Sequence, residues 1–115
     1  LYASGLRRAC RLWRSGSSIY TNSVLGARTN FEGGSSALAA ALTGRTPRYG
    51  YHLDERRRGT TPFYVSAQPE SYSDWGALGG SVGREMQSYR EVPDIDGIEL
   101  MPTSEELKHF GAALA

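Results

Sequence analysis

The second half of the sequence alternates short apolar runs with longer segments of helical periodicity, and this alternation restricts the fold more than any other feature. Residues 63–65 (Phe-Tyr-Val) predict a short strand, and Gly97–Met101 predicts a second one after an acidic turn. Between them, Ser73 or Asp74 can cap a helix that continues to about Tyr89, although four glycines weaken it.

A second helix is predicted at the end of the chain. Thr103 and Glu106 have the spacing of a capping box, and Leu107, Phe110 and Leu114 follow on one face. Strand, helix, strand and helix in short succession are typical of an α/β architecture. We therefore expect an α/β fold.

The first half contains one well-delimited helix. Residues 37–42 are good helix formers, Ser35 or Ser36 is a suitable N-cap, and Gly44 followed by Pro47 is a suitable stop. Nearer the N-terminus, the spacing of apolar residues predicts a basic helix over Leu1–Arg14 that Gly16–Ser18 interrupts.

Cys10 is the single cysteine of the chain, on the apolar side of the first predicted helix. It excludes an internal disulfide and any metal site with several thiolates from this chain alone, and it favours a reducing, cytosolic setting. No apolar run approaches the ~18 residues of a membrane span. Because the sequence begins with Leu1 and not Met, we expect a piece of a longer chain or a processed one.

Charge is distributed unevenly between the two halves. Residues 1–58 hold ten Arg and three acids, which gives +7, and residues 59–115 hold three basic residues and nine acids, which gives −6. Twelve of the thirteen basic residues are Arg. Arginine suits two-point contact with carboxylate or phosphate, and a GC-rich genome would produce the same bias.

Hydrogen-bonding side chains concentrate among small residues between positions 22 and 30. A core element would instead be rich in large apolar residues, so this stretch indicates a loop that lines a ligand site, with Arg28 as the partner of an acidic group. Gly33-Gly34 before the helix is either a second anion site or simply a flexible turn. His52, beside Asp54 and Glu55, is either a site residue or an ordinary loop histidine.

The basic run Arg56–Arg58 could contact nucleic acid. No aromatic residues interleave it, and two acids precede it, so a solvated loop is the preferred interpretation and no nucleic-acid partner is expected.

Several motifs together resemble the aconitase X family. They are Asn22–Asn30 (NSVLGARTN) with Glu32-Gly33-Gly34, residues 36–47 (SALAAALTGRTP), residues 49–57 (YGYHLDERR), Trp75–Gly79 and Met101–Lys108. The match covers residues 14–115 as part of the family's catalytic domain. Residues 1–13 are a divergent segment that does not resemble the family.

The resemblance implies an aconitase-like α/β large domain with short parallel strands and flanking helices. It implies an iron–sulfur cluster in full-length members and a smaller swivelling domain or subunit as partner. Family members are hydro-lyases that remove water from hydroxylated acids such as (R)-5-phosphomevalonate or cis-3-hydroxy-L-proline. Cluster iron acts on the leaving hydroxyl while a base on the small domain abstracts the proton.

The family's upstream Glu-Ser pair aligns with Arg14 and Ser15, so the hydroxyl contact is kept and the charge is reversed. Cys10 aligns with none of the cluster cysteines. We therefore expect no catalytic residue and no metal ligand in this chain. The expected substrate-binding residues are Ser15, which comes from the family match, together with Asn22, Ser23, Arg28, Asn30 and His52.

The leading hypothesis is thus a part of an aconitase X dehydratase that is inactive as an isolated chain and works in the cytoplasm without membrane or nucleic acid. The alternative is a small stand-alone module that binds acidic metabolites without catalysis.

Overall fold

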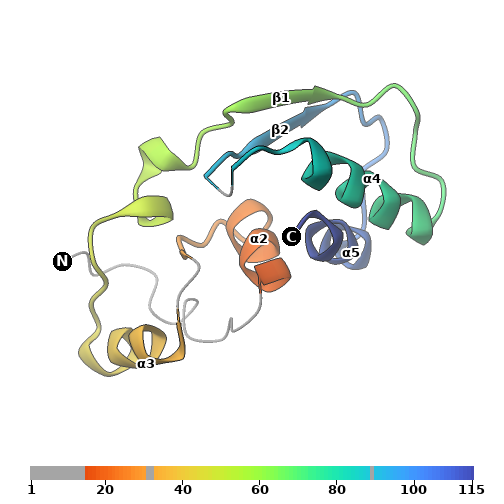
Figure 1. Cartoon of the computed structure of the whole chain (residues 1–115). Helices are drawn as coiled ribbons and strands as arrows, with labels where there is room; N and C mark the ends of the chain where they lie inside the picture. The colour runs from red at the N-terminus through yellow and green to blue at the C-terminus, as the bar shows by residue number, and fades with distance from the viewer. Residues whose placement is uncertain (1–14, 31–32, 89) are drawn as a thin grey trace. The chain divides into compact units, whose positions relative to one another are not determined.

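The structure is a computed structural model that describes residues 15–30, 33–88 and 90–115. The chain divides into two compact units, residues 1–57 (unit 1) and 58–115 (unit 2) (Figure 1). The predicted helix over Leu1–Arg14 and Cys10 lie outside the described residues. Within the described part, no helix is long and apolar enough to cross a membrane.

The described residues of unit 1 form two helices and two single 3-10 turns. They are α2 (Ser15–Ser23), α3 (Gly34–Thr43), η1 (Gly50–His52) and η2 (Asp54–Arg56). The predicted interruption at Gly16–Ser18 is wrong, because these residues lie inside α2. A glycine costs a helix only about 1 kcal/mol, which tertiary packing can outweigh.

Helix α3 confirms the predicted helix, and its stop at Gly44 is also confirmed. Gly44 has φ +72° and its N–H donates to the Ala40 carbonyl. The predicted N-cap is wrong, however. The N-cap residue is Gly33, which has no side chain to accept a capping hydrogen bond. The Ser36 hydroxyl instead donates to the Gly33 carbonyl at 2.9 Å.

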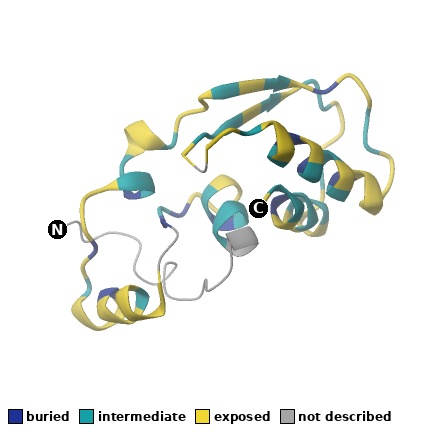
Figure 2. Cartoon of the chain, viewed as in Figure 1, coloured by how far each residue is buried: buried dark blue, intermediate teal, exposed yellow. Residues whose placement is uncertain are grey.

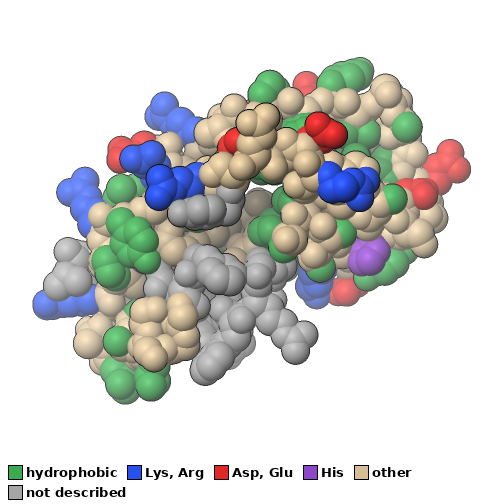
Figure 3. Space-filling view, in the orientation of Figure 1, with side chains coloured by type: hydrophobic (Ala, Val, Ile, Leu, Met, Phe, Trp, Pro, Cys, Tyr) green, Lys and Arg blue, Asp and Glu red, His purple; other side chains and the backbone are tan. Residues whose placement is uncertain are grey.

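Apolar side chains on α3 are open to solvent. Leu38 is 60% exposed and Leu42 is 79% exposed, and Ala40 is the buried residue of this helix (Figure 2). Space filling shows hydrophobic side chains open on the surface (Figure 3). Exposed apolar surface of this kind marks contact with another polypeptide surface when it is contiguous.

Unit 2 contains the sheet. Strand β1 (Thr61–Tyr64) pairs in parallel with β2 (Pro93–Asp96), in a register that places Thr61 opposite Pro93. Helix α4 (Tyr72–Glu85) connects the strands, and α5 (Ser104–Leu114) follows them. The predicted α/β class with short parallel strands and flanking helices is therefore confirmed.

The position of the second strand differs from the prediction. The strand lies at residues 93–96 and not at Gly97–Met101, because Gly97 adopts φ +88° and ends it. Pro93 occupies the first position of the strand, where the missing N–H is tolerated. Alternate residues of both strands are half-buried, and the residues between them are exposed.

The two helices of unit 2 lie on one side of the sheet (Figure 1). Helix α4 begins after Ser71, so the predicted cap at Ser73 or Asp74 is wrong. Asp74 is instead the reciprocal partner that accepts from the Ser71 N–H at 2.9 Å. The helix ends at Glu85 and not near Tyr89. The predicted Thr103–Glu106 capping box of α5 is confirmed.

Glycines let α4 and α5 approach closely. A Cβ atom on Gly79 would overlap the carbonyl oxygen of Phe110, and one on Gly83 would lie 2.6 Å from that of Leu114. Gly79 and Gly83, which weaken α4 as an isolated helix, therefore form its contact with α5. Beside this contact lie the buried side chains Trp75 and Val82.

The two capping carboxylates make stability depend on pH. The hydrogen bonds from Ser71, first through its side chain, lower the pKa of Asp74 below its usual 3.8. Those from Thr103, first through its backbone, lower the pKa of Glu106 below 4.5. Because both values are depressed in the folded state, their stabilisation is complete above the unfolded-state pKa and is lost as pH falls through the folded-state pKa.

We therefore expect Asp74→Asn and Glu106→Gln to lower Tm at about pH 6. The loss of Tm should become smaller as the pH falls through the lowered pKa values of the two carboxylates, because the wild-type groups then become protonated as well. Thermal melts followed by circular dichroism measure this difference. A Tm difference that does not change with pH would contradict the assignment.

Candidate functional site

Buried polar side chains distinguish unit 1 from unit 2. Among the described residues, the buried polar side chains all lie in unit 1, whereas the larger buried apolar side chains all lie in unit 2. The polar set consists of Thr21, Thr29, Asn30, Thr46 and His52, and the apolar set consists of Val65, Trp75 and Val82. Most of the polar set lies in segments 22–30 and 49–57, which we call the polar loops. Hydrogen bonds therefore hold these loops more than hydrophobic packing does.

Asn22, the penultimate residue of α2, fixes the first polar loop. Its Nδ2 donates to the Thr29 carbonyl at 2.6 Å, and its Oδ1 accepts from the Thr29 N–H at 2.9 Å. A side-chain amide that pairs with both the N–H and the C=O of one residue imitates a strand ladder and closes the turn between the two residues. Both polar atoms of the predicted site residue Asn22 thus have protein partners.

Asn30 joins the two polar loops. Its Nδ2 donates to the Tyr49 carbonyl at 3.2 Å, and its Oδ1 accepts from the Tyr51 N–H at 2.6 Å. Gly50 lies between these two partners with φ +55°, and a Cβ atom there would overlap Asn30 Oδ1. Only glycine satisfies both the backbone angle and the close approach.

Arg28 carries an accessible positive charge on the first polar loop. Its Nη2 lies 2.6 Å from Oδ1 of Asp54, and the two side chains are 32% and 74% exposed. An exposed ion pair contributes only about 0–1 kcal/mol, so an acidic ligand can share or replace the carboxylate at little cost. The pair shows that an acid fits beside this guanidinium.

The remaining predicted site residues differ in accessibility. His52 is 2% exposed, and its Nδ1 lies 2.7 Å from the Pro47 carbonyl, which fixes the ring inside the second polar loop. Ser23 is exposed at the end of α2. Ser15 is the first residue of α2, and its side chain lies outside the described residues. The predicted residues that remain all lie in the polar loops: Asn22, Ser23, Arg28, Asn30 and His52.

Arg57 is the residue that sequence reasoning missed. The sequence predicts a solvated basic run, but the Arg57 guanidinium turns inward and donates to Oδ1 and the carbonyl of Asn22 at 3.3 and 2.9 Å. It also donates to the Ala27 carbonyl. The prediction is therefore wrong at Arg57, whereas its neighbours Arg56 and Arg58 are exposed. Nothing in the local sequence separates the three arginines.

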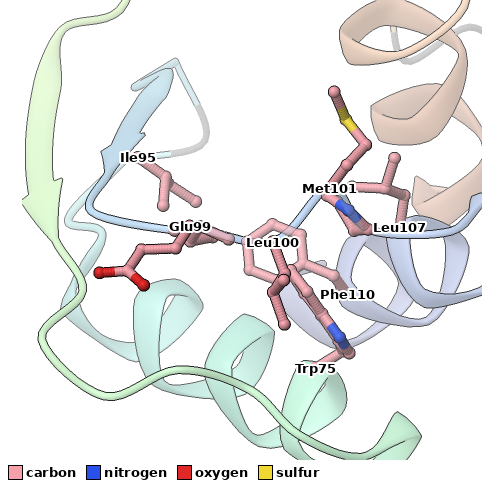
Figure 4. A pocket seen from close by; sticks show the side chains of 9 residues that line it. Trp75, Ile95, Glu99, Leu100, Met101, Leu107 and Phe110 are labelled. Atoms are coloured by element: carbon pink, nitrogen blue, oxygen red, sulfur yellow. The ribbon is translucent and has the colours of Figure 1, made fainter.

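Unit 2 carries an apolar groove of about 360 Å³ that none of the predicted site residues lines. Trp75 and Phe110 form part of its wall, and Met101 extends away from the two rings (Figure 4). Glu99 is the one charged residue among those lining it. Such a groove lacks the convergent polar groups that a site for a small acid needs.

The donor set decides whether a metal ion could bind. Among the described residues, no group of three or more His, Cys, Asp or Glu side chains could hold a metal ion. The described residues therefore do not fit the ligand set of an iron–sulfur cluster, which needs thiolates.

Most residues of the polar loops lie within a segment that a family model matches. Residues 12–55 match the family model described as "Aconitase X first domain". The predicted resemblance to the aconitase X family is confirmed.

Curated relatives agree with this assignment. The chain is 46% identical over 111 residues to the phosphomevalonate dehydratase large subunit of Methanothermobacter thermautotrophicus, covering 96% of this chain and 27% of the relative. It is 44% identical over 103 residues to the phosphomevalonate dehydratase large subunit of Thermococcus kodakarensis, and the match covers 89% of this chain and 26% of that relative. It is 39% identical over 101 residues to the cis-3-hydroxy-L-proline dehydratase of Pseudomonas aeruginosa, and the match covers 84% of this chain and 17% of that relative. The chain thus spans about a quarter of the length of the large subunits that it matches.

A solved structure shares the fold. The crystal structure of Thermococcus kodakaraensis aconitase X in its holo form superposes with a TM-score of 0.76 at 44% identity. The match covers 88% of this chain and 25% of that chain.

Proposed function

We propose that this chain is part of an iron–sulfur-dependent hydro-lyase that removes water from a hydroxylated acid, with 5-phosphomevalonate as the preferred candidate substrate. Residues 14–115 supply part of the catalytic domain, and residues 1–13 are a divergent segment. The polar loops form part of the substrate pocket. Cluster ligands and a small swivelling subunit come from outside this chain, and the assembly works in the reducing cytoplasm.

One observation carries the proposal. The Arg28 guanidinium is accessible and already holds a carboxylate at 2.6 Å, on a loop whose backbone Asn22 and Asn30 fix by hydrogen bonds. A fixed loop with one available cation is what recognition of an acidic substrate requires. Ser23, exposed beside it, can add a hydroxyl contact.

The chemistry gives Arg28 a specific task. Dehydration breaks a C–H bond next to the carboxylate and a C–O bond on the neighbouring carbon. The proton passes to a base, and the hydroxyl group leaves with the C–O bonding electrons and takes up a proton to become water. Negative charge accumulates on the substrate carboxylate as the proton departs. Two hydrogen bonds from a guanidinium stabilise that charge. They become stronger in the transition state, where the carboxylate carries more negative charge, than in the ground state. The base is expected on the small subunit.

The choice of substrate rests on similarity. The relatives named as phosphomevalonate dehydratase large subunits are 44–46% identical over most of this chain, whereas those named as cis-3-hydroxy-L-proline dehydratases are 39% and 34% identical.

The apolar residues exposed on α3 support the proposal that another polypeptide covers this helix in the assembly, because Leu42 is 79% exposed.

The isolated chain is expected to be inactive. After anaerobic incubation with iron and sulfide, it should show no cubane absorbance and no dehydration of 5-phosphomevalonate or cis-3-hydroxy-L-proline. The measurement is the visible absorption spectrum together with product analysis. Turnover by this chain alone would refute the proposed inactivity.

A stand-alone acid-binding module is the second candidate, favoured by the fact that the Arg28 site is built within unit 1 alone. Calorimetry with 5-phosphomevalonate, cis-3-hydroxy-L-proline and citrate separates the two candidates. Saturable binding by a cooperatively melting monomer would favour the module. A chain that binds none of the three acids would favour a part of a larger enzyme.

A further inference from the structure

Arg57 concentrates its hydrogen bonds on one short stretch of chain. The residue follows η2, and its guanidinium donates to the Asn22 side chain, to the Asn22 carbonyl and to the Ala27 carbonyl. These partners are 30 to 35 residues away in sequence. The contacts therefore tie the end of the second polar loop to the whole turn of the first.

The two backbone carbonyl acceptors need a donor. The Asn22 carbonyl lies in the last turn of α2, where helix carbonyls have no partner within the helix. Ala27 is 5% exposed, so its carbonyl is screened from much of the solvent. A cation at a helix C-terminus is also favoured by the helix dipole. Arg57 thus provides a donor for the carbonyl oxygens of Asn22 and Ala27.

The same turn determines where Arg28 lies. Asn22 Oδ1 accepts from both Arg57 and the Thr29 N–H, so the guanidinium and the Asn22–Thr29 pair form one network. Arg28 lies between Ala27, which Arg57 contacts, and Thr29, which Asn22 contacts. The backbone on both sides of Arg28 is therefore fixed by this network.

We infer that Arg57 is a positioning residue for the acid-binding side chain Arg28, an inference that rests on the function proposed above. Only a planar guanidinium can direct parallel N–H groups at several acceptors, so lysine cannot replace it. Segment 54–57 then holds the first loop twice, through Arg57 on its backbone and through Asp54 on the guanidinium of Arg28.

The test uses the full chain with Arg57→Lys and Arg57→Gln, and Arg58→Lys as the matched control on an exposed neighbour. Hydrogen exchange at the Thr29 amide reports the turn, and the NMR signal of the Arg28 Nε–H reports the side chain. We expect both Arg57 variants to exchange the Thr29 amide faster by about tenfold or more and to shift the Arg28 signal. Exchange in α3 should stay unchanged, and so should every signal in Arg58→Lys.

Two results would overturn the inference. One is an unchanged Thr29 amide and Arg28 signal in Arg57→Gln, and the other is faster exchange throughout unit 1, which indicates a general structural role. Titration with 5-phosphomevalonate separates this inference from the proposed function. If the wild-type chain binds and Arg57→Lys binds at least tenfold more weakly, the role of Arg57 and acid binding by the polar loops are both supported. Failure of the wild type to bind counts against acid binding by the chain, while the exchange data still decide the role of Arg57.

Discussion

Gly79→Ala is expected to destabilise the chain by about 1–3 kcal/mol, because the added methyl group overpacks a tight contact. The methyl group would overlap the Phe110 carbonyl oxygen on α5. A backbone atom cannot rotate away as a side chain does, so the helices must separate and lose contact around buried Trp75. Urea denaturation followed by far-UV circular dichroism measures the free energy of unfolding.

Gly80 provides the matched control on the same helix. A Cβ atom there would have Arg84 Nη1 at 3.7 Å as its nearest neighbour, which is ordinary contact. Gly80→Ala should therefore stabilise the chain by about 0.5–1 kcal/mol, the usual gain of replacing glycine inside a helix. Equal effects of the two substitutions would show that α4 and α5 do not meet at Gly79.

Gly50→Ala is expected to cost more than its backbone angle alone explains. Placing alanine at φ +55° costs about 1–2 kcal/mol. In addition, the methyl group displaces the Asn30 amide, and each buried polar group left unpaired costs about 1–3 kcal/mol. The same denaturation experiment measures the sum.

Gly26→Ala isolates the cost of the angle. Gly26 has φ +64°, and no atom lies within 4 Å of the place that a Cβ would occupy, so its substitution introduces strain without a clash. We expect it to destabilise the chain less than Gly50→Ala. If the two costs are equal, Asn30 does not join the polar loops in solution.

Local signals in the sequence predict the helices better than the strands. The Thr103–Glu106 box and the Gly44 stop are encoded by the residues that form them, so both are confirmed. The predicted position of the second strand is wrong because its pairing with β1 depends on a distant partner. The glycines of α4 are misleading for the same reason, since their benefit lies in contact with α5.

The candidate site shows the same division. Composition indicates a polar loop at residues 22–30, and the structure places polar side chains there in a hydrogen-bonded arrangement. The partners of these side chains could not be predicted. Arg57 is 30 residues from Ala27, and only the folded chain distinguishes it from the exposed arginines on either side.

The most direct test of the account is a chimaera in which this chain replaces the matching segment of the Thermococcus kodakarensis large subunit, assembled with its small subunit. We expect it to dehydrate 5-phosphomevalonate. Arg28→Gln should lower kcat/KM by about a hundredfold, the loss expected for a charged contact to the substrate. Arg48→Gln, at another exposed arginine of unit 1, should leave kcat/KM unchanged. An active chimaera in which Arg28→Gln retains full kcat/KM would contradict the assignment of the polar loops to the substrate pocket.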